Sequence, residues 1–472
     1  MARPMTDRRD IVVVGAGPTG LGAAQRLEEL GCDWELLEAT QTAGGLAGSF
    51  TDGQGFTWDY GGHVQHSHYD SFDRAMDTAL GPEGWLVHRR HSSVWMRGRF
   101  IPYPFQHHLH HLDADDCQRA LDGLRDAARH HDVLAASSHF DEWIVRSFGA
   151  ALADLFMRPY NRKVWQFPLA ELDHGWTGDR VAVVDVDRLA RAVAEGRDDD
   201  TWGPNATFRY PRQGGTGAPW RAIAAALPVG RVRYGQRVAG LDLQRREVVL
   251  TTGERRGYQH LVSTLPLDML LTMCGNPAAP VAVAPGRLRY SSIDIVGLGL
   301  EGTPPAHLAE RCWMYFPESS SPYFRVTLLS RYSPLNVPAP GRSWSLMAEV
   351  ASLPDVGTPA SALVARVRAA LEADGLLPAG TPVLSLVHQH CERGYPTPFL
   401  GRDATVEPIL QWFEQQGVFS RGRFGGWKYE VSNQDHSFAQ GREVAERLHH
   451  GGDRTMEPTL WTPALVNRRR NA

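Results

Sequence analysis

The first chemically informative feature of the chain is a glycine-rich turn. Gly15, Gly17 and Gly20 form a GxGxxG pattern, which lets the backbone turn tightly and approach a pyrophosphate closely. Glu38 follows at the spacing expected for an acid that binds a ribose hydroxyl. A helix that begins at the turn would add free N–H groups and a partial positive charge. The pattern therefore predicts a dinucleotide-binding turn.

The segments around this turn occur in the order that such a site requires. Residues 11–14 are a β-branched run, which is typical of a parallel strand buried on both faces. Residues 21–30 are expected to form a helix that ends at Gly31, and residues 34–37 a second strand. Strand, glycine turn, helix, strand and acid together predict a Rossmann-like α/β domain.

A second glycine cluster bears on whether the dinucleotide is FAD or NAD. It spans residues 44–49, just after Glu38. The arrangement resembles the FAD proteins that include amine oxidases and protoporphyrinogen oxidases, in which a second glycine cluster also lines the cofactor. A plain NAD dehydrogenase does not need it. We therefore expect FAD.

Composition excludes several classes of protein. The chain has 472 residues, of which 42% are hydrophobic, enough for several domain-sized units. Its net charge of -4 gives no electrostatic reason to bind nucleic acid. The five cysteines contain no CxxC pair, which argues against a disulfide framework or a zinc site. Without a signal peptide or an apolar run of about 18 residues, we expect a cytoplasmic enzyme that binds no membrane.

The rest of the chain changes periodicity from segment to segment. Residues 140–156 space their apolar side chains at helical intervals, whereas residues 233–264 and 293–350 have the character of strands. Residues 363–371 are expected to form a helix. The polar, arginine-containing segment beyond Gly451 is expected to be loose.

A series of sequence blocks keeps one order from about residue 10 to about residue 445. The blocks are residues 61–69, 101–106, 153–165, 203–208, 214–217, 312–317, 324–325, 394–398 and 422–437. Together they resemble the UDP-galactopyranose mutase family, and its eukaryotic branch more than the short bacterial one. The resemblance covers nearly the whole chain.

The resemblance implies an α/β fold in three parts. A Rossmann-like FAD domain is built from discontinuous segments and is joined by an inserted helical domain and an antiparallel sheet domain. We expect FAD-binding parts at residues 8–100, 229–275 and 415–450, a mainly helical substrate domain at 101–228, a sheet domain at 285–400 and a tail at 451–472.

The resemblance also implies an isomerase that contracts a sugar ring without net redox change. In the family, N5 of reduced flavin attacks the anomeric carbon, the nucleotide diphosphate leaves, and a flavin iminium holds the opened sugar while O4 closes on C1. The flavin is the nucleophile, and the protein supplies orientation and electrostatics. The implied reaction converts UDP-galactopyranose to UDP-galactofuranose, with FAD reduced by NADPH or NADH.

Three residues match the family's reacting centre. Arg180 and Arg325 match arginines that hold the departing diphosphate, where fixed positive charge stabilises the leaving group. His63 matches a histidine whose loop lies against the flavin ring and changes conformation with its redox state. His66 and His68 lie nearby, but no carboxylate or cysteine pattern accompanies them, so we expect no metal.

Two further sets of residues follow from the same match. The expected substrate-binding residues are Tyr103, Phe105, Gln106, Asn161, Trp165, Asn205, Trp313, Tyr315, Tyr395 and Tyr429. The expected FAD-binding residues are Gly15, Gly17, Pro18, Thr19, Gly20, Glu38, Gly45, Leu46, Gly62, Val238, Arg423, Asn433, Gln434 and Ser437. Ser437 also suits the start of a helix that continues through Ala445.

Departures from the family pattern keep alternatives open. His107 and His108 replace an Asn-Asn pair of the eukaryotic members, and His66 stands where they carry phenylalanine. A mutase acting on a GDP-hexose is therefore an alternative. An amine-oxidase-like oxidoreductase and a non-catalytic FAD-binding module would share the glycine clusters. The loop between Leu335 and Trp344 lacks an insertion that the family ties to tetramers, so a monomer or a small homo-oligomer is expected.

Overall fold

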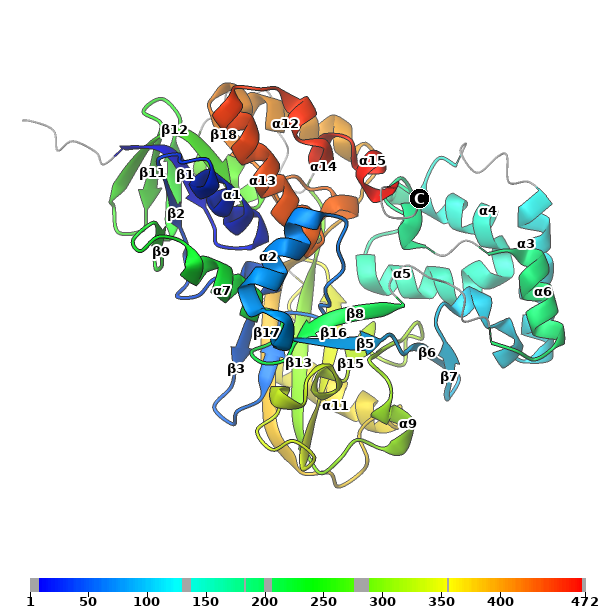
Figure 1. The fold of residues 1–472 in the computed structure, drawn as a ribbon. Helices are drawn as coiled ribbons and strands as arrows, with labels where there is room; N and C mark the ends of the chain where they lie inside the picture. The colour runs from blue at the N-terminus through cyan, green and yellow to red at the C-terminus, as the bar shows by residue number, and fades with distance from the viewer. Residues whose placement is uncertain are drawn as a thin grey trace, which may run out of the picture.

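The structure is a computed structural model that describes residues 8–129, 137–181, 184–198, 206–275, 288–354 and 356–468. Three parts surround its centre: a mixed, mainly parallel sheet with its helices, a second sheet below it, and a group of helices to one side (Figure 1). No helix in these ranges combines the length and the apolar character needed to cross a bilayer.

The first sheet contains the predicted dinucleotide-binding strand at its centre. Its order is β10-β11-β12-β1-β2-β9, and β18 also pairs with β12. The strands are β1 (Arg8–Val14), β2 (Trp34–Leu37), β9 (Val232–Arg233), β10 (Val238–Asp242), β11 (Glu247–Leu250), β12 (Arg255–Ser263) and β18 (Val418–Ser420). Strand β1 runs parallel to both of its neighbours. Its alternate residues enter two different cores, so the prediction of a strand buried on both faces is confirmed.

Helices cover both faces of this sheet. One core includes residues of α1 (Pro18–Glu29), α2 (Asp70–Leu80), α7 (Ala218–Ala226) and α13 (Gln434–His450). The opposite core includes residues of α8 (Leu267–Met273) and α12 (Arg402–Gln415). Helices α1 and α13 pack closely through glycine: a Cβ atom at Gly441 would lie 2.0 Å from the carbonyl oxygen of Thr19. The close approach brings the first turns of both helices to one place.

The second sheet supports the other side of the site. Its order is β17-β13-β16-β15-β14-β6-β7, antiparallel except between β14 and β6. The strands are β6 (Ser92–Met96), β7 (Arg99–Pro102), β13 (Tyr290–Glu301), β14 (Trp313–Tyr315), β15 (Arg325–Thr327), β16 (Ser343–Ser352) and β17 (Val383–Pro396). Residues 92–102 thus join this sheet and not the FAD domain, because β6 finds its partner in β14, far along the chain.

Helix α11 packs on one face of the second sheet. It spans Ala360–Ala373 and includes the predicted helix at residues 363–371. Its Leu363, Val367 and Leu371 share a core with β13 residues such as Leu298. Short elements complete this part of the molecule: β3 (Ser49–Thr51), β4 (Thr57–Asp59), α9 (Ala306–Ala309) and α10 (Leu329–Tyr332).

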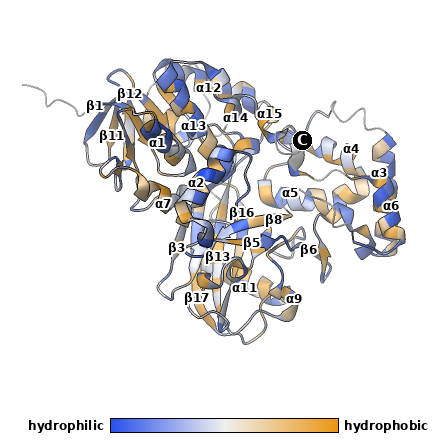
Figure 2. Cartoon of the chain, in the orientation of Figure 1, coloured by the Kyte–Doolittle hydropathy of each residue, from blue (hydrophilic) through white to orange (hydrophobic). Residues whose placement is uncertain are grey.

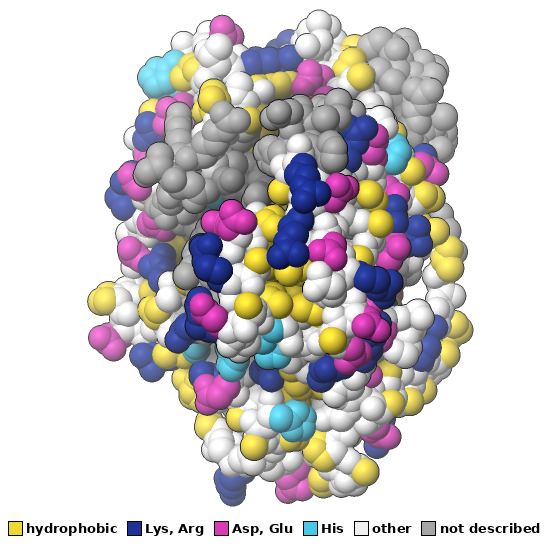
Figure 3. Space-filling model, turned by 90° about the vertical axis from the view of Figure 1, so that its right-hand side faces the viewer, with side chains coloured by type: hydrophobic (Ala, Val, Ile, Leu, Met, Phe, Trp, Pro, Cys, Tyr) yellow, Lys and Arg dark blue, Asp and Glu magenta, His cyan; other side chains and the backbone are white. Residues whose placement is uncertain are grey.

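The helical part is smaller than the expected span of residues 101–228. It comprises α3 (Ala114–Arg129), α4 (Phe140–Leu152), a π-helical turn (Ala153–Met157), α5 (Arg158–Trp165) and α6 (Val186–Ala194). Residues 207–211 instead form β8, which pairs with β5 (Trp85–Arg89), and α7 packs beside the first sheet. Apolar and polar bands alternate on the outer helices (Figure 2), and charges of both signs are interspersed on the outward face of this part (Figure 3).

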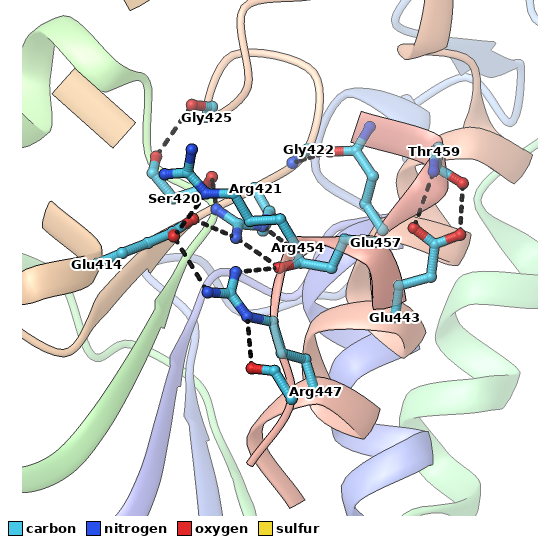
Figure 4. Close-up of polar contacts among 12 residues, drawn as sticks. Glu414, Ser420, Arg421, Gly422, Gly425, Glu443, Arg447, Arg454, Glu457 and Thr459 are labelled. Atoms are coloured by element: carbon cyan, nitrogen blue, oxygen red, sulfur yellow. Dashed lines mark hydrogen bonds and ion pairs between the residues drawn. The ribbon is translucent and has the colours of Figure 1, made fainter. Parts of the chain in front are cut away.

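The C-terminal segment is packed, and the expectation of a loose tail is wrong for its described residues. Helices α14 (Pro458–Trp461) and α15 (Pro463–Arg468) follow α13, and Leu460 and Val466 are buried. A buried network of arginines and carboxylates ties Glu457 to β18 and α13 (Figure 4). Arg421 lies 36 residues and Arg447 lies 10 residues before Glu457, and the polar composition of the segment did not reveal either contact.

Candidate active site

One cavity of about 820 Å³ lies where the three parts meet, and most of the predicted residues line it. They are Gly15, Gly17, Pro18, Thr19, Glu38, Gly45, Leu46, Gly62, His63, Tyr103, Gln106, Asn161, Trp165, Arg180, Trp313, Tyr315, Arg325, Tyr395, Arg423, Tyr429, Asn433, Gln434 and Ser437. The glycine turn, the second sheet and the helical part thus contribute to a single compartment.

Three predicted residues do not line this cavity. Phe105 packs in the core, with its ring stacked 4.8 Å from that of Phe156. Gly20 lies inside α1, where a Cβ atom would sit 1.7 Å from the Gly15 carbonyl oxygen, so glycine serves packing there. Val238 is a buried residue of β10. Asn205 lies outside the described residues.

The glycine turn has the features of a pyrophosphate cradle. Helix α1 begins after Gly17, and no side chain caps its free N–H groups. The Glu38 carboxylate accepts the backbone N–H of Ala16 at 2.7 Å, which holds the acid beside the turn. The second glycine cluster packs against the first: a Cβ atom at Gly45 would lie 3.3 Å from the Cα atom of Gly17. Side chains at these positions would fill the space beside the helix N-terminus.

A second helix N-terminus opens into the same cavity. Helix α13 begins at Gln434, with Asn433 as the N-cap residue, so the expected start at Ser437 is wrong. The Ser437 N–H instead donates to the Asn433 carbonyl at 2.9 Å, inside the first turn. No side chain caps this helix either. Two helix N-termini therefore direct partial positive charge into one compartment.

Arg423 adds a full positive charge to this side of the cavity. Its guanidinium donates to the Gly394 carbonyl at 2.8 Å and to the Ser432 hydroxyl at 3.0 Å. Neither partner is a carboxylate, and burial lowers the pKa of Arg423. A partly buried cation held by neutral groups favours an anion nearby.

Strand register explains the geometry around Arg325. Tyr315, Arg325 and Glu349 are directly opposite one another on β14, β15 and β16. Arg325 binds Glu349 in a bidentate pair, with Nη2 at 2.7 Å from Oε2. Burial opposes the charge on Arg325, but Glu349 outweighs it and raises the arginine's pKa. The Gly62 N–H donates to the same carboxylate at 3.1 Å, which anchors the 61–63 loop.

His63 is held neutral beside these arginines. Burial, followed by the charges of Arg325 and Arg423, lowers its pKa to about 3. Its Nδ1 atom is buried and has no hydrogen-bond partner among the described residues. A neutral imidazole can either donate or accept a hydrogen bond, so His63 is available to a ligand in the cavity.

Arg180 joins the helical part to the FAD side. Its Nη2 donates to the Glu430 carbonyl at 2.9 Å, and the guanidinium lies 4.9 Å from the centre of the Tyr429 ring. As with Arg423, neither contact neutralises the charge. Arg180, Arg325 and Arg423 all line the cavity, and of these three only Arg325 is paired with a carboxylate in these contacts.

Aromatic rings form the walls next to these cations. Tyr429 makes edge contacts with Trp165 at 4.9 Å and with Trp176 at 5.3 Å. Tyr395 lies 5.9 Å from Tyr429, and burial raises its pKa to about 12. Its hydroxyl therefore keeps its proton at neutral pH and can donate a hydrogen bond to an anion.

Several lining residues were not predicted individually. Phe156 and Met157 come from the π-helical turn, a distortion that often occurs at functional sites. Tyr160 follows on α5, with its ring 5.4 Å from that of Tyr315. These residues lie within the block 153–165, so the block was an available signal for them. No sequence pattern pointed to Glu349, because only the register of β15 and β16 brings it to Arg325.

A histidine–carboxylate cluster also borders the cavity. His68 Nδ1 lies 2.7 Å from Asp435, and the His68 and His436 rings are 4.7 Å apart. Asn467 of α15 lies 2.9 Å from His436 and also lines the cavity. The carboxylate that contacts His68 is not one of its sequence neighbours, because tertiary packing brings Asp435 to it. The cluster has ligand atoms within 4.8 Å of one another.

Comparisons with known proteins agree with the arrangement of this site. The family model for flavin-containing amine oxidoreductases matches residues 18–448. A crystal structure of reduced UDP-galactopyranose mutase is 42% identical, with a TM-score of 0.90, over 97% of this chain and 99% of that one. A putrescine oxidase bound to putrescine is 15% identical with a TM-score of 0.61, covering 93% of this chain and 99% of that one, and shares the fold.

Two curated relatives match only a short part of the chain. The lysine-specific histone demethylase 1 of Caenorhabditis elegans is 34% identical over 120 residues, which are 25% of this chain and 15% of that protein. The zeta-carotene-forming phytoene desaturase of Myxococcus xanthus is 50% identical over 56 residues, 12% of this chain and 11% of that protein. The chain thus spans a small fraction of both.

Proposed function

The chain belongs to the flavin-containing amine oxidoreductases and, within them, to the UDP-galactopyranose mutase family, and from this premise we propose that it interconverts UDP-galactopyranose and UDP-galactofuranose. It is an isomerase that uses FAD. The observation that carries the substrate proposal is the convergence of Arg180, Arg325 and two tyrosine hydroxyl groups on the cavity that contains the dinucleotide cradle.

The cavity suits FAD on its glycine-lined side. The two uncapped helix N-termini would bind the pyrophosphate and a polar edge of the flavin, and Glu38 would bind a ribose hydroxyl. Arg423 would favour negative charge on the ring system. When bound and reduced, FAD supplies the nucleophile for the anomeric carbon. NADPH or NADH is our proposed reductant.

The opposite side suits a departing diphosphate. Arg325 uses Nε and Nη2 for Glu349, which leaves Nη1 for a ligand. Arg180 is bound only through neutral groups and can exchange them for phosphate oxygens. Tyr395 and Tyr429 would add hydroxyl donors. Charges fixed before the reaction stabilise a leaving diphosphate without reorganisation, at about 3 kcal/mol for a key contact.

The aromatic walls would orient the sugar and the base. Trp165 and Trp176 border the arginines, and such rings exclude water and strengthen the electrostatic interactions beside them. Tyr103, Gln106 and Tyr315 form a separate corner, with the two tyrosine rings 4.9 Å apart. We propose that this corner binds uracil. A GDP-hexose is the alternative substrate, because His107 and His108 directly follow the corner.

The proposal is tested by following ring interconversion directly. Dithionite-reduced protein is incubated with UDP-galactofuranose and, separately, with GDP-hexoses, and products are separated by chromatography. We expect UDP-galactopyranose to form only with reduced flavin. Conversion of a GDP-hexose but not of UDP-galactofuranose would show that the substrate carries guanine and not uracil. No conversion of any substrate would refute the mutase proposal, and oxygen uptake with an amine would favour an oxidase.

A further inference from the structure

A second group of titratable side chains lies outside the cavity, where the chain places four histidines within five residues. His107 ends the 3₁₀ turn Phe105–His107, His108 follows it, and His110 and His111 belong to the next 3₁₀ turn, Leu109–His111. In a 3₁₀ turn, side chains three residues apart lie on the same side, so His108 and His111 are neighbours. Figure 3 shows histidine side chains at the surface of the helical part.

The fold adds a carboxylate to these histidines. Asp198 follows α6, 87 residues beyond His111. One of its oxygens lies 3.0 Å from His110 Nε2 and 2.7 Å from His111 Nε2. The two imidazole rings are 4.2 Å apart, and all three potential ligand atoms lie within 4.8 Å of one another.

These distances suit a tetrahedral metal ion. Zinc binds imidazole nitrogen and carboxylate oxygen at about 2.0–2.2 Å, so tetrahedral ligand atoms lie about 3.3–3.5 Å apart. The nitrogen–oxygen distances at Asp198 are shorter by a few tenths of an ångström, and small side-chain rotations would accommodate an ion. His111 and Asp198 are partly exposed, which leaves room for water as a further ligand.

Hydrogen bonding in the cluster is also incomplete. His108 is buried, its Nε2 has no partner among the described residues, and its ring lies 6.5 Å from that of His110. The Nδ1 atom of His110 is likewise buried without a partner. Buried polar atoms are normally hydrogen-bonded, so the surroundings of these two nitrogens are unusually polar, and the Nε2 atoms of His110 and His111 remain directed at Asp198.

We propose that His110, His111 and Asp198 bind a divalent transition metal ion of the zinc type, with water completing its coordination. Two imidazoles and a carboxylate are ligands that zinc commonly takes. The ion would connect the 3₁₀ turn at residues 109–111 to the chain after α6. This turn begins three residues after Gln106 of the cavity corner, so the ion would help to fix the chain next to that corner.

The role proposed for the ion is structural. The three ligands are not among the residues that line the cavity. Ring interconversion is therefore not required for metal binding. The proposal does not depend on the substrate assignment, and either one can fail alone.

The test uses FAD-loaded protein treated with a chelator and then dialysed. Zinc chloride is titrated calorimetrically into the wild type, His111→Ala and Asp198→Asn, and bound metal is counted by mass spectrometry after desalting. We expect one saturable equivalent in the wild type and at least about tenfold weaker binding in both variants, because even supporting residues of metal sites change affinity by about 10–100-fold. Binding should weaken at acidic pH, since protonated imidazole cannot coordinate.

His388→Ala is a matched control. His388 and His390 also share one oxygen of an aspartate, at 2.7 and 2.9 Å from Asp294, but without gathering three ligand atoms within 4.8 Å of one another. This variant should bind zinc as the wild type does. Zinc should also raise the thermal midpoint of the wild type and of His388→Ala, but not of Asp198→Asn. Absent or unsaturable binding in the wild type, or unchanged affinity in Asp198→Asn, would overturn the proposal.

Discussion

Arg325 and Arg421 both make bidentate contact with a glutamate, but Arg421 is fully buried and Arg325 only partly so. Arg421 donates to Glu457, to Glu414 and to the Ser420 carbonyl, and it does not line the cavity (Figure 4). Arg325 donates to Glu349 through two nitrogens and faces the cavity with the third. An arginine–glutamate pair can therefore stabilise the fold when all the guanidinium nitrogens are bonded within the protein. When one nitrogen remains free, the same kind of pair can offer a fixed positive charge to a ligand.

The comparison extends to the carboxylates. In the Arg421 network, Arg447 and Arg454 also bind Glu414, and Arg447 binds Glu457, so each carboxylate has several cationic partners. In the cavity, Arg180 and Arg423 donate to neutral groups among the described residues. The cavity thus contains arginines that lack a carboxylate partner in these contacts, whereas all three arginines of the network bind a carboxylate.

The largest effect is expected from Arg421→Ala. Removing one partner of a buried pair leaves the other charge uncompensated, and we expect the free energy of unfolding to fall by about 3–5 kcal/mol. Urea denaturation measures this loss. Arg442 pairs with Glu29 at the surface, so Arg442→Ala should cost less than about 1 kcal/mol. Equal losses in the two variants would show that the network does not stabilise the fold.

Arg325→Ala should affect turnover more than it affects folding or FAD content. Loss of a preorganised charge at the leaving group should lower kcat by roughly 10²–10³-fold, whereas flavin absorbance per protein should stay near that of the wild type. Arg325→Ala alone leaves the Glu349 carboxylate unpaired. The double variant with Glu349→Gln removes that carboxylate charge, so its remaining loss of activity reports on the missing guanidinium. Full activity in the double variant would remove Arg325 from the reacting site, and Arg421→Ala should keep its turnover per folded molecule.

Tyr395→Phe measures what a neutral donor adds beside the arginines. A hydrogen bond to a charged group contributes about 1.5–3 kcal/mol, so kcat/KM should fall by roughly ten- to a hundredfold. Tyr258→Phe is a suitable control, because Tyr258 is buried in β12 away from the cavity. A loss of the same size in both variants would indicate a packing effect.

A pH dependence of the free energy of unfolding is also expected, and it arises beside the Arg421 network. Burial raises the pKa of Glu443 from 4.5 to about 8, although Thr459 donates to its carboxylate. The folded protein then holds a proton that the unfolded chain releases, so the free energy of unfolding should fall as pH rises between these values. The slope should reach at most about 1.4 kcal/mol per pH unit.

Glu443→Gln removes this titration and should flatten the pH profile of unfolding. Glu446→Gln, at a half-exposed carboxylate paired with Arg26, is the matched control and should leave the slope unchanged. An identical slope in wild type and Glu443→Gln would contradict the assignment of the proton to Glu443.

Where local geometry decides the structure, the sequence was informative. The run at residues 11–14, the glycine turn and α1 were predicted because strand, turn and helix each depend on neighbouring residues. Most predicted site residues also line the cavity, since whole blocks of the chain resemble one family. Gly20 and Val238 resemble ligand-contacting positions, but close packing in α1 and β10 accounts for them.

Other features depend on partners that no local pattern reveals. The pairing of Arg325 with Glu349 required the register of two strands, and Asp435 reached His68 across more than three hundred residues. The docking of α14 and α15 depended on a network whose members are spread from Glu414 to Thr459. The sequence thus determined which groups could bind a dinucleotide and a diphosphate. Tertiary structure decided which of these charged side chains lack an oppositely charged partner, because such partners lie far away in the sequence.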